Sequence, residues 1–192
     1  MPVTRREFLA PNRDLGRDYD VLFVDTEFSR LPHRHEGIWD WARSVELLSV
    51  GITALDSVEP LVFYATRRLT PQIRRVCSSF VTDEVLLHLD AVASTVRFDA
   101  PKGLGEAMTD YLRARSKATG KLPAFAVDWA GDAWLLDPVA PSGTPWILLE
   151  DLPGLSTSMD TFFSAQQAVA RHNAYSDAQA LRSAYLKWRE GA

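Results

Sequence analysis

The sequence predicts an α/β fold in which a mixed β-sheet is flanked by α-helices. Three apolar segments, at 19–28, 45–55 and 60–65, follow one another with short polar breaks, which is typical of an antiparallel meander. Two further apolar segments, at 122–128 and 144–150, alternate with helical patterns, and this order favours strands that are covered by helices. We therefore expect one sheet that combines an antiparallel meander with parallel strands.

Two apolar stripes at helical spacing predict the long helices. The first has the spacing i, i+3, i+4, i+7 and i+8, and it consists of Leu104, Ala107, Met108, Tyr111 and Leu112. We expect this helix to end near Gly120, because glycine readily adopts the left-handed conformation that closes a helix. The second stripe covers 174–188 and predicts a C-terminal helix. Shorter helices are expected at 70–80, 83–90 and 129–137.

Length and composition limit the class of protein. The 192 residues suffice for one domain, which we place at 19–192, after a polar and flexible N-terminal arm at 1–18. The formal net charge of −4 argues against a protein that holds nucleic acid by neutralising phosphates alone. Cys77 is the single cysteine, so an intramolecular disulfide is excluded, and a cytoplasmic location is expected. No apolar run approaches the ~18 residues of a membrane span, so no membrane association is expected.

Two carboxylates, Asp25 and Glu27, stand at the end of the first predicted strand. Residues two apart in a strand project to the same face, so these side chains repel each other where water is scarce. The nearest cationic side chain, Arg30, could pair with only one of them. A divalent cation between the two carboxylates resolves the conflict better, because Mg²⁺ and Mn²⁺ prefer hard oxygen ligands.

Further candidate side chains lie far along the chain. Asp132 comes at a strand–helix junction, where it could also cap the helix, and Asp128 and Asp137 are competitors in the same stretch. His172 precedes Asp177 by five residues at the opening of the last predicted helix. On a continuous helix that separation corresponds to about 500°, so a break near His172 is needed for the two side chains to converge.

These three motifs together resemble the DEDDh family of 3′–5′ exonucleases: D-x-E on the first strand, an aspartate at a mid-chain strand–helix junction, and H-x4-D near the C-terminus. "DTEF", followed by "ELLSVGI" in the second strand, resembles in particular a small bacterial exoribonuclease branch of that family. The resemblance implies a ribonuclease H-like fold. It also implies two divalent cations, Mg²⁺ or Mn²⁺, with His172 as the general base and a ligand set of Asp25, Glu27, Asp132 and Asp177. The tyrosine-type subfamily has a tyrosine at the position of Asn173, so the histidine type fits this chain better.

The resemblance leaves the third carboxylate and the substrate contacts open. The family often has Asn and an apolar residue shortly before the aspartate of the second motif, whereas this chain has "DWAGD". Asp132 is favoured over Asp128 because the apolar residues of "DAWLL" can pack that helix against the sheet. Phe28, which could wedge against the terminal base, and Arg30 are the substrate-binding candidates, although a place in the core is favoured for Phe28. The segment 29–43 could hold a single strand, or it could form a packing loop or a subunit interface.

The expected function is a metal-dependent 3′–5′ exonuclease that hydrolyses phosphodiester bonds at the 3′ ends of single-stranded nucleic acid. The resemblance favours RNA over DNA as the substrate, and it is compatible with a homodimer. One alternative is a DNA 3′–5′ exonuclease of the proofreading or repair type. Another is a nuclease-like module that binds nucleic acid or a partner without cutting, and its signature would be a missing carboxylate or histidine, whereas all are present here.

Overall fold

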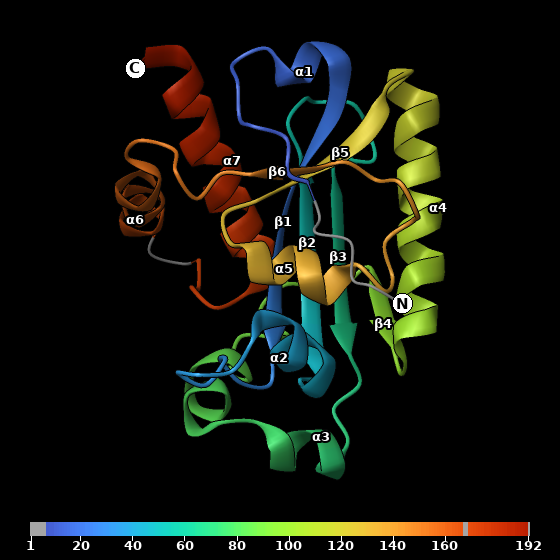
Figure 1. Cartoon of the computed structure of the whole chain (residues 1–192), viewed down its shortest axis with the longest axis vertical. Coiled ribbons are helices and arrows are strands. Elements are labelled where there is room, and N and C mark those ends of the chain that lie inside the picture. The colour runs from blue at the N-terminus through green and yellow to red at the C-terminus, as the bar shows by residue number, and fades with distance from the viewer. Residues whose placement is uncertain (1–6, 167–168, 192) are drawn as a thin grey trace.

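The computed structural model describes residues 7–166 and 169–191, and these contain a six-stranded mixed sheet (Figure 1). Its strands are β1 (Tyr19–Phe28), β2 (Leu47–Ala54), β3 (Val62–Arg67), β4 (Val96–Phe98), β5 (Leu122–Val127) and β6 (Trp146–Leu148). They lie in the order β4-β3-β2-β1-β5-β6. The pairs β1–β2 and β2–β3 are antiparallel, and the other three pairs are parallel. The predicted mixture of a meander with parallel strands is thereby confirmed.

Helices cover both faces of the sheet (Figure 1). The described helices are α1 (Leu15–Asp18), α2 (Ile38–Ser44), α3 (Pro71–Val76), the single π-helical turn η1 (Val81–Val85), α4 (Pro101–Thr119), α5 (Ala130–Leu136), α6 (Leu155–Ala165) and α7 (Ala174–Gly191). One apolar core lies between the sheet and α4 with α5, a second lies between the sheet and α6 with α7, and a smaller third one includes the side chains of η1. Within the described residues, no helix is both long and apolar enough to cross a bilayer.

Strand β1 contributes to both cores, because its side chains alternate between the two faces of the sheet. Leu22 and Val24 belong to the core under α4, whereas Val21 and Phe23 belong to the core under α7. Asp25 and Glu27 follow Val21 and Phe23 at intervals of two residues, so they belong to the same face of the strand. Their side chains therefore project on the α7 side, at the carboxyl end of the strand.

Gly51 lets α7 begin directly against the sheet. Gly51 pairs with Asp25 in the register of β1 and β2. A Cβ atom at position 51 would lie only 2.2 Å from the carbonyl oxygen of Ala174, the first residue of α7. Because only glycine leaves this space free, the first turn of the last helix can lie beside Asp25.

Several predicted elements have the expected bounds, and others differ. The first strand spans 19–28 as predicted, and α4 ends at Gly120, which has a left-handed φ of 69°. The helix predicted at 83–90 is wrong, because only the π-helical turn Val81–Val85 forms there. Strand β4 and the helices α2 and α6 were not predicted from the apolar pattern.

Residues 7–18 are the described part of the predicted arm at 1–18, and they contact the rest of the chain. The backbone N–H of Leu9 donates to the carbonyl oxygen of Trp146 over 2.8 Å, and the Tyr185 hydroxyl donates to the carbonyl oxygen of Asn12 over 2.7 Å. Leu15 is buried. The other residues of the arm lie outside the described part, so a flexible arm followed by a single domain at 19–192 stays a prediction.

Candidate active site

Three carboxylates meet where the carboxyl end of β1 faces the start of α7. One oxygen from each of Asp25, Glu27 and Asp177 lies within 4.8 Å of the others. Asp25 and Glu27 come from β1, and Asp177 lies in the first turn of α7. The close approach over Gly51 is what brings this turn to the strand.

A second set of carboxylates shares Asp25 with the first. One oxygen from each of Asp25, Asp128 and Asp132 also lies within 4.8 Å of the others. Asp128 follows the end of β5 directly, and Asp132 lies in the first turn of α5. The structure thus brings both Asp128 and Asp132 close to Asp25. Asp137 follows the end of α5 and belongs to neither set.

The break that the H-x4-D spacing requires lies at His172. Its φ of 60° is left-handed, so the chain does not enter α7 as a continuous helix through this residue. The ring of Phe80 packs edge-on against the imidazole, with 5.1 Å between ring centroids. His172 and Asp177 consequently line the same cavity.

Asn173 ties the start of α7 to the sheet and is fully buried. Its side-chain amide donates to the Tyr64 hydroxyl over 2.9 Å and to the His88 carbonyl oxygen over 2.7 Å, while its amide oxygen accepts from the backbone N–H of Ser176. Its own backbone N–H donates to Oδ2 of Asp177 over 3.0 Å. Asn173 therefore constrains the two residues that flank it in the motif, His172 and Asp177.

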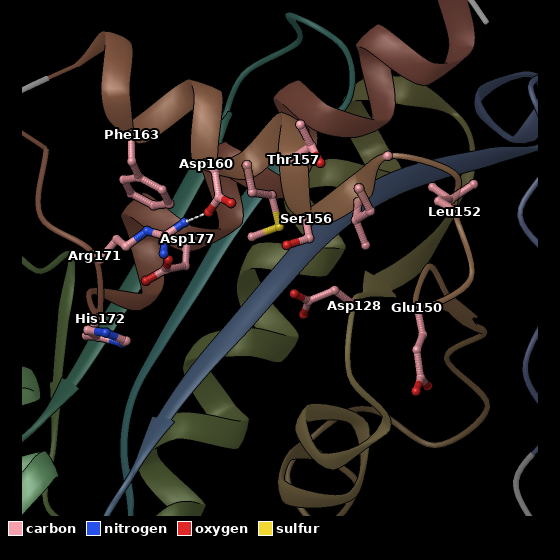
Figure 2. Close-up of a pocket in the computed structure, with 13 residues that line it drawn as sticks. Asp128, Glu150, Leu152, Ser156, Thr157, Asp160, Phe163, Arg171, His172 and Asp177 are labelled. Atoms are coloured by element: carbon pink, nitrogen blue, oxygen red, sulfur yellow. Dashed lines mark hydrogen bonds and ion pairs between the residues drawn. The ribbon is translucent and has the colours of Figure 1, made fainter.

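The carboxylates lie at the junction of two cavities. The first, here the carboxylate pocket, has a volume of about 320 Å³ and is lined by all five carboxylates and by apolar side chains that include those of η1. The second, here the α6 pocket, has a volume of about 550 Å³ and lies against α6 (Figure 2). Figure 2 shows His172 and Asp177 on one side of the α6 pocket and Asp128 and Glu150 on another. The two cavities share Asp128, Met159, His172 and Asp177.

The five carboxylates form no ion pair with the cationic side chains that the structure describes. In the described part of the chain, no Lys or Arg forms an ion pair with any of them. Burial, followed by the repulsion of neighbouring carboxylates, raises the pKa of Asp25 and of Glu27 well above the ordinary values. Burial also raises the pKa of Asp132 well above its ordinary value, and it raises the pKa of Asp177 to about 7. The metal-free site thus retains protons at a pH where exposed carboxylates are ionised.

The pKa of His172 is shifted in the opposite direction, to favour the neutral form. Burial lowers the pKa of its imidazole below the ordinary value, and the neighbouring positive charge of Arg171 lowers it further. The guanidinium of Arg171 pairs with Asp160 of α6 (Figure 2). The imidazole is therefore neutral at pH 7 and can accept a proton.

The donor set fits a hard divalent cation. Glu27 is only 9 % exposed, and its carboxylate forms no hydrogen bond with any other described residue. A buried carboxylate without a partner is costly. Carboxylate oxygens grouped in this way are the ligands that Mg²⁺ and Mn²⁺ prefer.

The two predicted substrate-binding residues have other partners in this structure. Phe28 packs against Trp41 and Trp129, with ring centroids 4.9 and 5.7 Å away, although it also lines the carboxylate pocket. The guanidinium of Arg30 forms a bidentate pair with Glu36 over 2.7 and 2.8 Å. Within 29–43, Trp41 is fully buried and donates to the carbonyl oxygen of Arg30, so this part of the segment packs against the domain.

Sequence reasoning missed three parts of the site. The Thr26 hydroxyl donates to Oδ1 of Asp132 over 2.5 Å, and its position between the two first-strand acids was the available signal. The capping role of Asn173 could have been inferred from its place at a helix start. The wall formed by α6, including Met159, had no recognisable motif.

No family model matches the chain, and no curated protein sequence matches it. Three solved structures of yeast proteins are similar to it. A structure of S. pombe Pop2p with Mg²⁺ and Mn²⁺ bound has a TM-score of 0.57 and 16 % identity, over 92 % of this chain and 84 % of that one. The RNase domain of the yeast Pop2 protein has a TM-score of 0.55 and 12 % identity, over 91 % of this chain and 78 % of that one. A structure of the yeast NOT1 MIF4G domain co-crystallised with CAF1 has a TM-score of 0.51 and 11 % identity, over 91 % of this chain and 81 % of the matched chain.

The similarity establishes the fold. It is the ribonuclease H-like fold of these Pop2 structures, so the predicted fold class is confirmed. The expected similarity to a small bacterial exoribonuclease branch is not supported, because these structures contain yeast proteins.

Proposed function

We propose that this protein is a metal-dependent 3′–5′ exonuclease that hydrolyses phosphodiester bonds at the 3′ end of single-stranded nucleic acid, with RNA preferred to DNA. The observation that carries the proposal is the grouping of buried and half-buried carboxylates around a single pocket, where no Lys or Arg among the described residues forms an ion pair with them. The fold supports it, because similar folds occur in RNase domains and one of those structures binds Mg²⁺ and Mn²⁺.

Four side chains are the proposed cation ligands: Asp25, Glu27, Asp132 and Asp177. Two bound divalent cations would activate a water molecule and stabilise the negative charge on the phosphate and on the leaving oxygen. Asp25 belongs to both carboxylate sets, so it would hold the two ions together. Thr26 would keep Asp132 oriented through its hydrogen bond.

His172 is the proposed general base. It lines the same pocket as the carboxylates, and its lowered pKa leaves the imidazole neutral at pH 7. A neutral imidazole can take the proton of the attacking water as the phosphodiester bond is cleaved. The left-handed backbone at His172 is what lets the ring face the pocket beside Asp177.

The proposed substrate is RNA rather than DNA. The preference for RNA is supported by the similarity to RNase domains, and a DNA 3′–5′ exonuclease is the alternative. A binding module without catalysis is a second candidate, because one similar structure is a co-crystal of CAF1 with the NOT1 MIF4G domain. The homodimer and the cytoplasmic location stay predictions.

The test uses 5′-labelled single-stranded RNA and the matching DNA, each incubated with Mg²⁺ or Mn²⁺ and then with EDTA. We expect a ladder that shortens from the 3′ end of the RNA, more slowly on DNA, and that disappears in EDTA. Cleavage that persists in EDTA would refute the metal-dependent mechanism. Retention of the RNA on the protein without any trimming, with either metal, would support the binding module instead.

A further inference from the structure

We infer that Asp128 is an additional ligand of the cation held beside Asp25 and Asp132. The inference rests on the proposed function, because it concerns the same metal centre. It goes beyond the four-carboxylate set that the sequence motifs assign. Asp128 lies between the motifs in "DWAGD", and it is not part of D-x-E or of H-x4-D.

The register of the sheet places Asp128 next to Asp25. Strands β1 and β5 are parallel, and their pairs run from Tyr19 with Leu122 to Phe23 with Ala126. Two residues further along, the same register sets Asp25 against Asp128, on neighbouring strands that are about 4.8 Å apart. Both positions keep the side-chain parity of the last pair, so the two carboxylates emerge on one side of the sheet edge.

The distances suit a shared ion. One oxygen of Asp128 lies within 4.8 Å of one oxygen each of Asp25 and Asp132. Opposite oxygens around a Mg²⁺ ion bound at about 2.1 Å are roughly 4.2 Å apart, so a small side-chain rotation brings all three within range.

The neighbouring ligands leave coordination positions open. Asp132 uses Oδ1 to accept the hydrogen bond from Thr26. Asp25 is shared with the set that contains Glu27 and Asp177. Because Mg²⁺ takes about six oxygen ligands, an ion held only by Asp25 and Asp132 would depend mostly on water. Asp128 supplies a further protein oxygen at that position.

Among the described residues, Asp128 is neither the N-cap of α5 nor a member of an ion pair, although its carboxylate accepts from backbone N–H groups at 128 and 129. The N-cap residue of α5 is Trp129, and it makes no side-chain capping bond. In the described part of the chain, no Lys or Arg forms an ion pair with Asp128. Its side chain instead borders both the carboxylate pocket and the α6 pocket (Figure 2).

The experiment measures Mn²⁺ binding to the metal-free protein, by the electron paramagnetic resonance signal of free Mn²⁺ and by calorimetry. Wild type, Asp128→Asn and Glu150→Gln are compared. Glu150 is the matched control, because it lines the same α6 pocket and acts electrostatically on Asp128 but belongs to neither carboxylate set. We expect two ions in the wild type, a loss of at least about tenfold in the affinity for one ion in Asp128→Asn, and unchanged binding in Glu150→Gln.

Two results would overturn the inference and leave the proposed function standing. One is an Asp128→Asn variant that binds both ions as the wild type does. The other is an equal loss in Glu150→Gln, which would mean that the charge of the pocket, not ligation, sets the affinity. A wild type that binds no Mn²⁺ would overturn the proposed function as well. Circular dichroism checks that each variant is folded, and Asp128→Ser, which also lacks the carboxylate, must reproduce the loss.

Discussion

The hydroxyl of Thr26 donates a hydrogen bond of 2.5 Å to Oδ1 of Asp132, and both residues are buried. The bond connects β1 to the first turn of α5. It leaves the second oxygen of Asp132 available for a cation, and it restricts the rotation of the carboxylate. The residue between the two first-strand acids is thus part of the support of the site.

Replacing Thr26 by Val, which has the same shape without the hydroxyl, is expected to weaken Mn²⁺ binding and to lower kcat, each by about 10–100-fold. The reason is that Asp132 loses the bond that orients it. Thr26→Ser keeps a hydroxyl and should retain most of both properties. Calorimetric Mn²⁺ titration and cleavage of labelled RNA measure the two effects. Equal behaviour of the Val and Ser variants would show that the hydroxyl does not matter.

Replacing Asp25 by Asn should abolish cleavage and remove binding of both ions, because Asp25 belongs to both carboxylate sets. Asp177→Asn is the comparison, because Asp177 belongs to one set only. We expect that variant to retain one Mn²⁺ ion while losing activity. Mn²⁺ titration counts the ions that each variant binds. Full activity in Asp25→Asn would refute the assignment of Asp25 as a ligand of both ions.

Replacing His172 by Asn is expected to lower kcat by about 10²–10⁴-fold while leaving Mn²⁺ binding and thermal stability close to wild type. Asn is the suitable substitute because it tolerates the left-handed backbone found at this position. Single-turnover cleavage measures the loss of the general base. A variant that cleaves at the wild-type rate would exclude this role.

Replacing Asn173 by Ala is expected to cost about 2–4 kcal/mol of unfolding free energy. The buried Tyr64 hydroxyl and the His88 carbonyl oxygen lose a donor, and α7 loses its N-terminal cap. The melting temperature should fall by roughly 5–15 °C. Tyr64→Phe removes one of the bonds to Asn173 and the bond from the Tyr64 hydroxyl to the Leu89 carbonyl oxygen, but it keeps the cap of α7, so it should cost less. Equal melting temperatures of the two variants would show that the cap formed by Asn173 contributes little to the unfolding free energy.

The metal-free protein is expected to lose stability as the pH rises from about 4 to 7. Burial raises the pKa of Asp177 to about 7, whereas an unfolded carboxyl titrates near ~3.9. Between these values the folded state binds a proton that the unfolded state lacks, so the free energy of unfolding falls with rising pH and levels off above the folded pKa. Melting curves in EDTA at pH 5, 6, 7 and 8 measure this trend.

Two controls accompany that measurement. The Asp177→Asn variant should show a weaker pH dependence, because it lacks one of the titrating groups. Added Mn²⁺ should stabilise the protein most at high pH, since ligands bind metal in their deprotonated form. Metal-free melting temperatures that increase steadily up to pH 8 would contradict the raised pKa values.

The elements that could be predicted are those set by local pattern. The apolar run before Asp25 and Glu27 marked β1 with its bounds, and the stripe that stops at Gly120 marked α4. The convergence of distant carboxylates followed from the family resemblance and a required break at His172. The left-handed φ there supplies that break.

The parts that could not be predicted depend on contacts between distant segments. Helix α6 has no capping side chain at Gly154. In the helix predicted at 83–90, only a π-helical turn forms, and it packs against Leu48 and Ile73, which no local pattern specifies. Phe28 was a substrate-binding candidate by its place after Glu27, and it lines the carboxylate pocket, but its ring also packs against Trp41 and Trp129, which no local pattern specifies.

The docking of α7 over Gly51 has a consequence for protein synthesis. The carboxylates of the first strand leave the ribosome early, whereas Asp177 emerges with the last helix and can reach them only after that helix has settled on β2. A nascent chain without this helix holds an incomplete centre. The proposed exonuclease would therefore lack activity until the residues of α7 have been synthesised and folded.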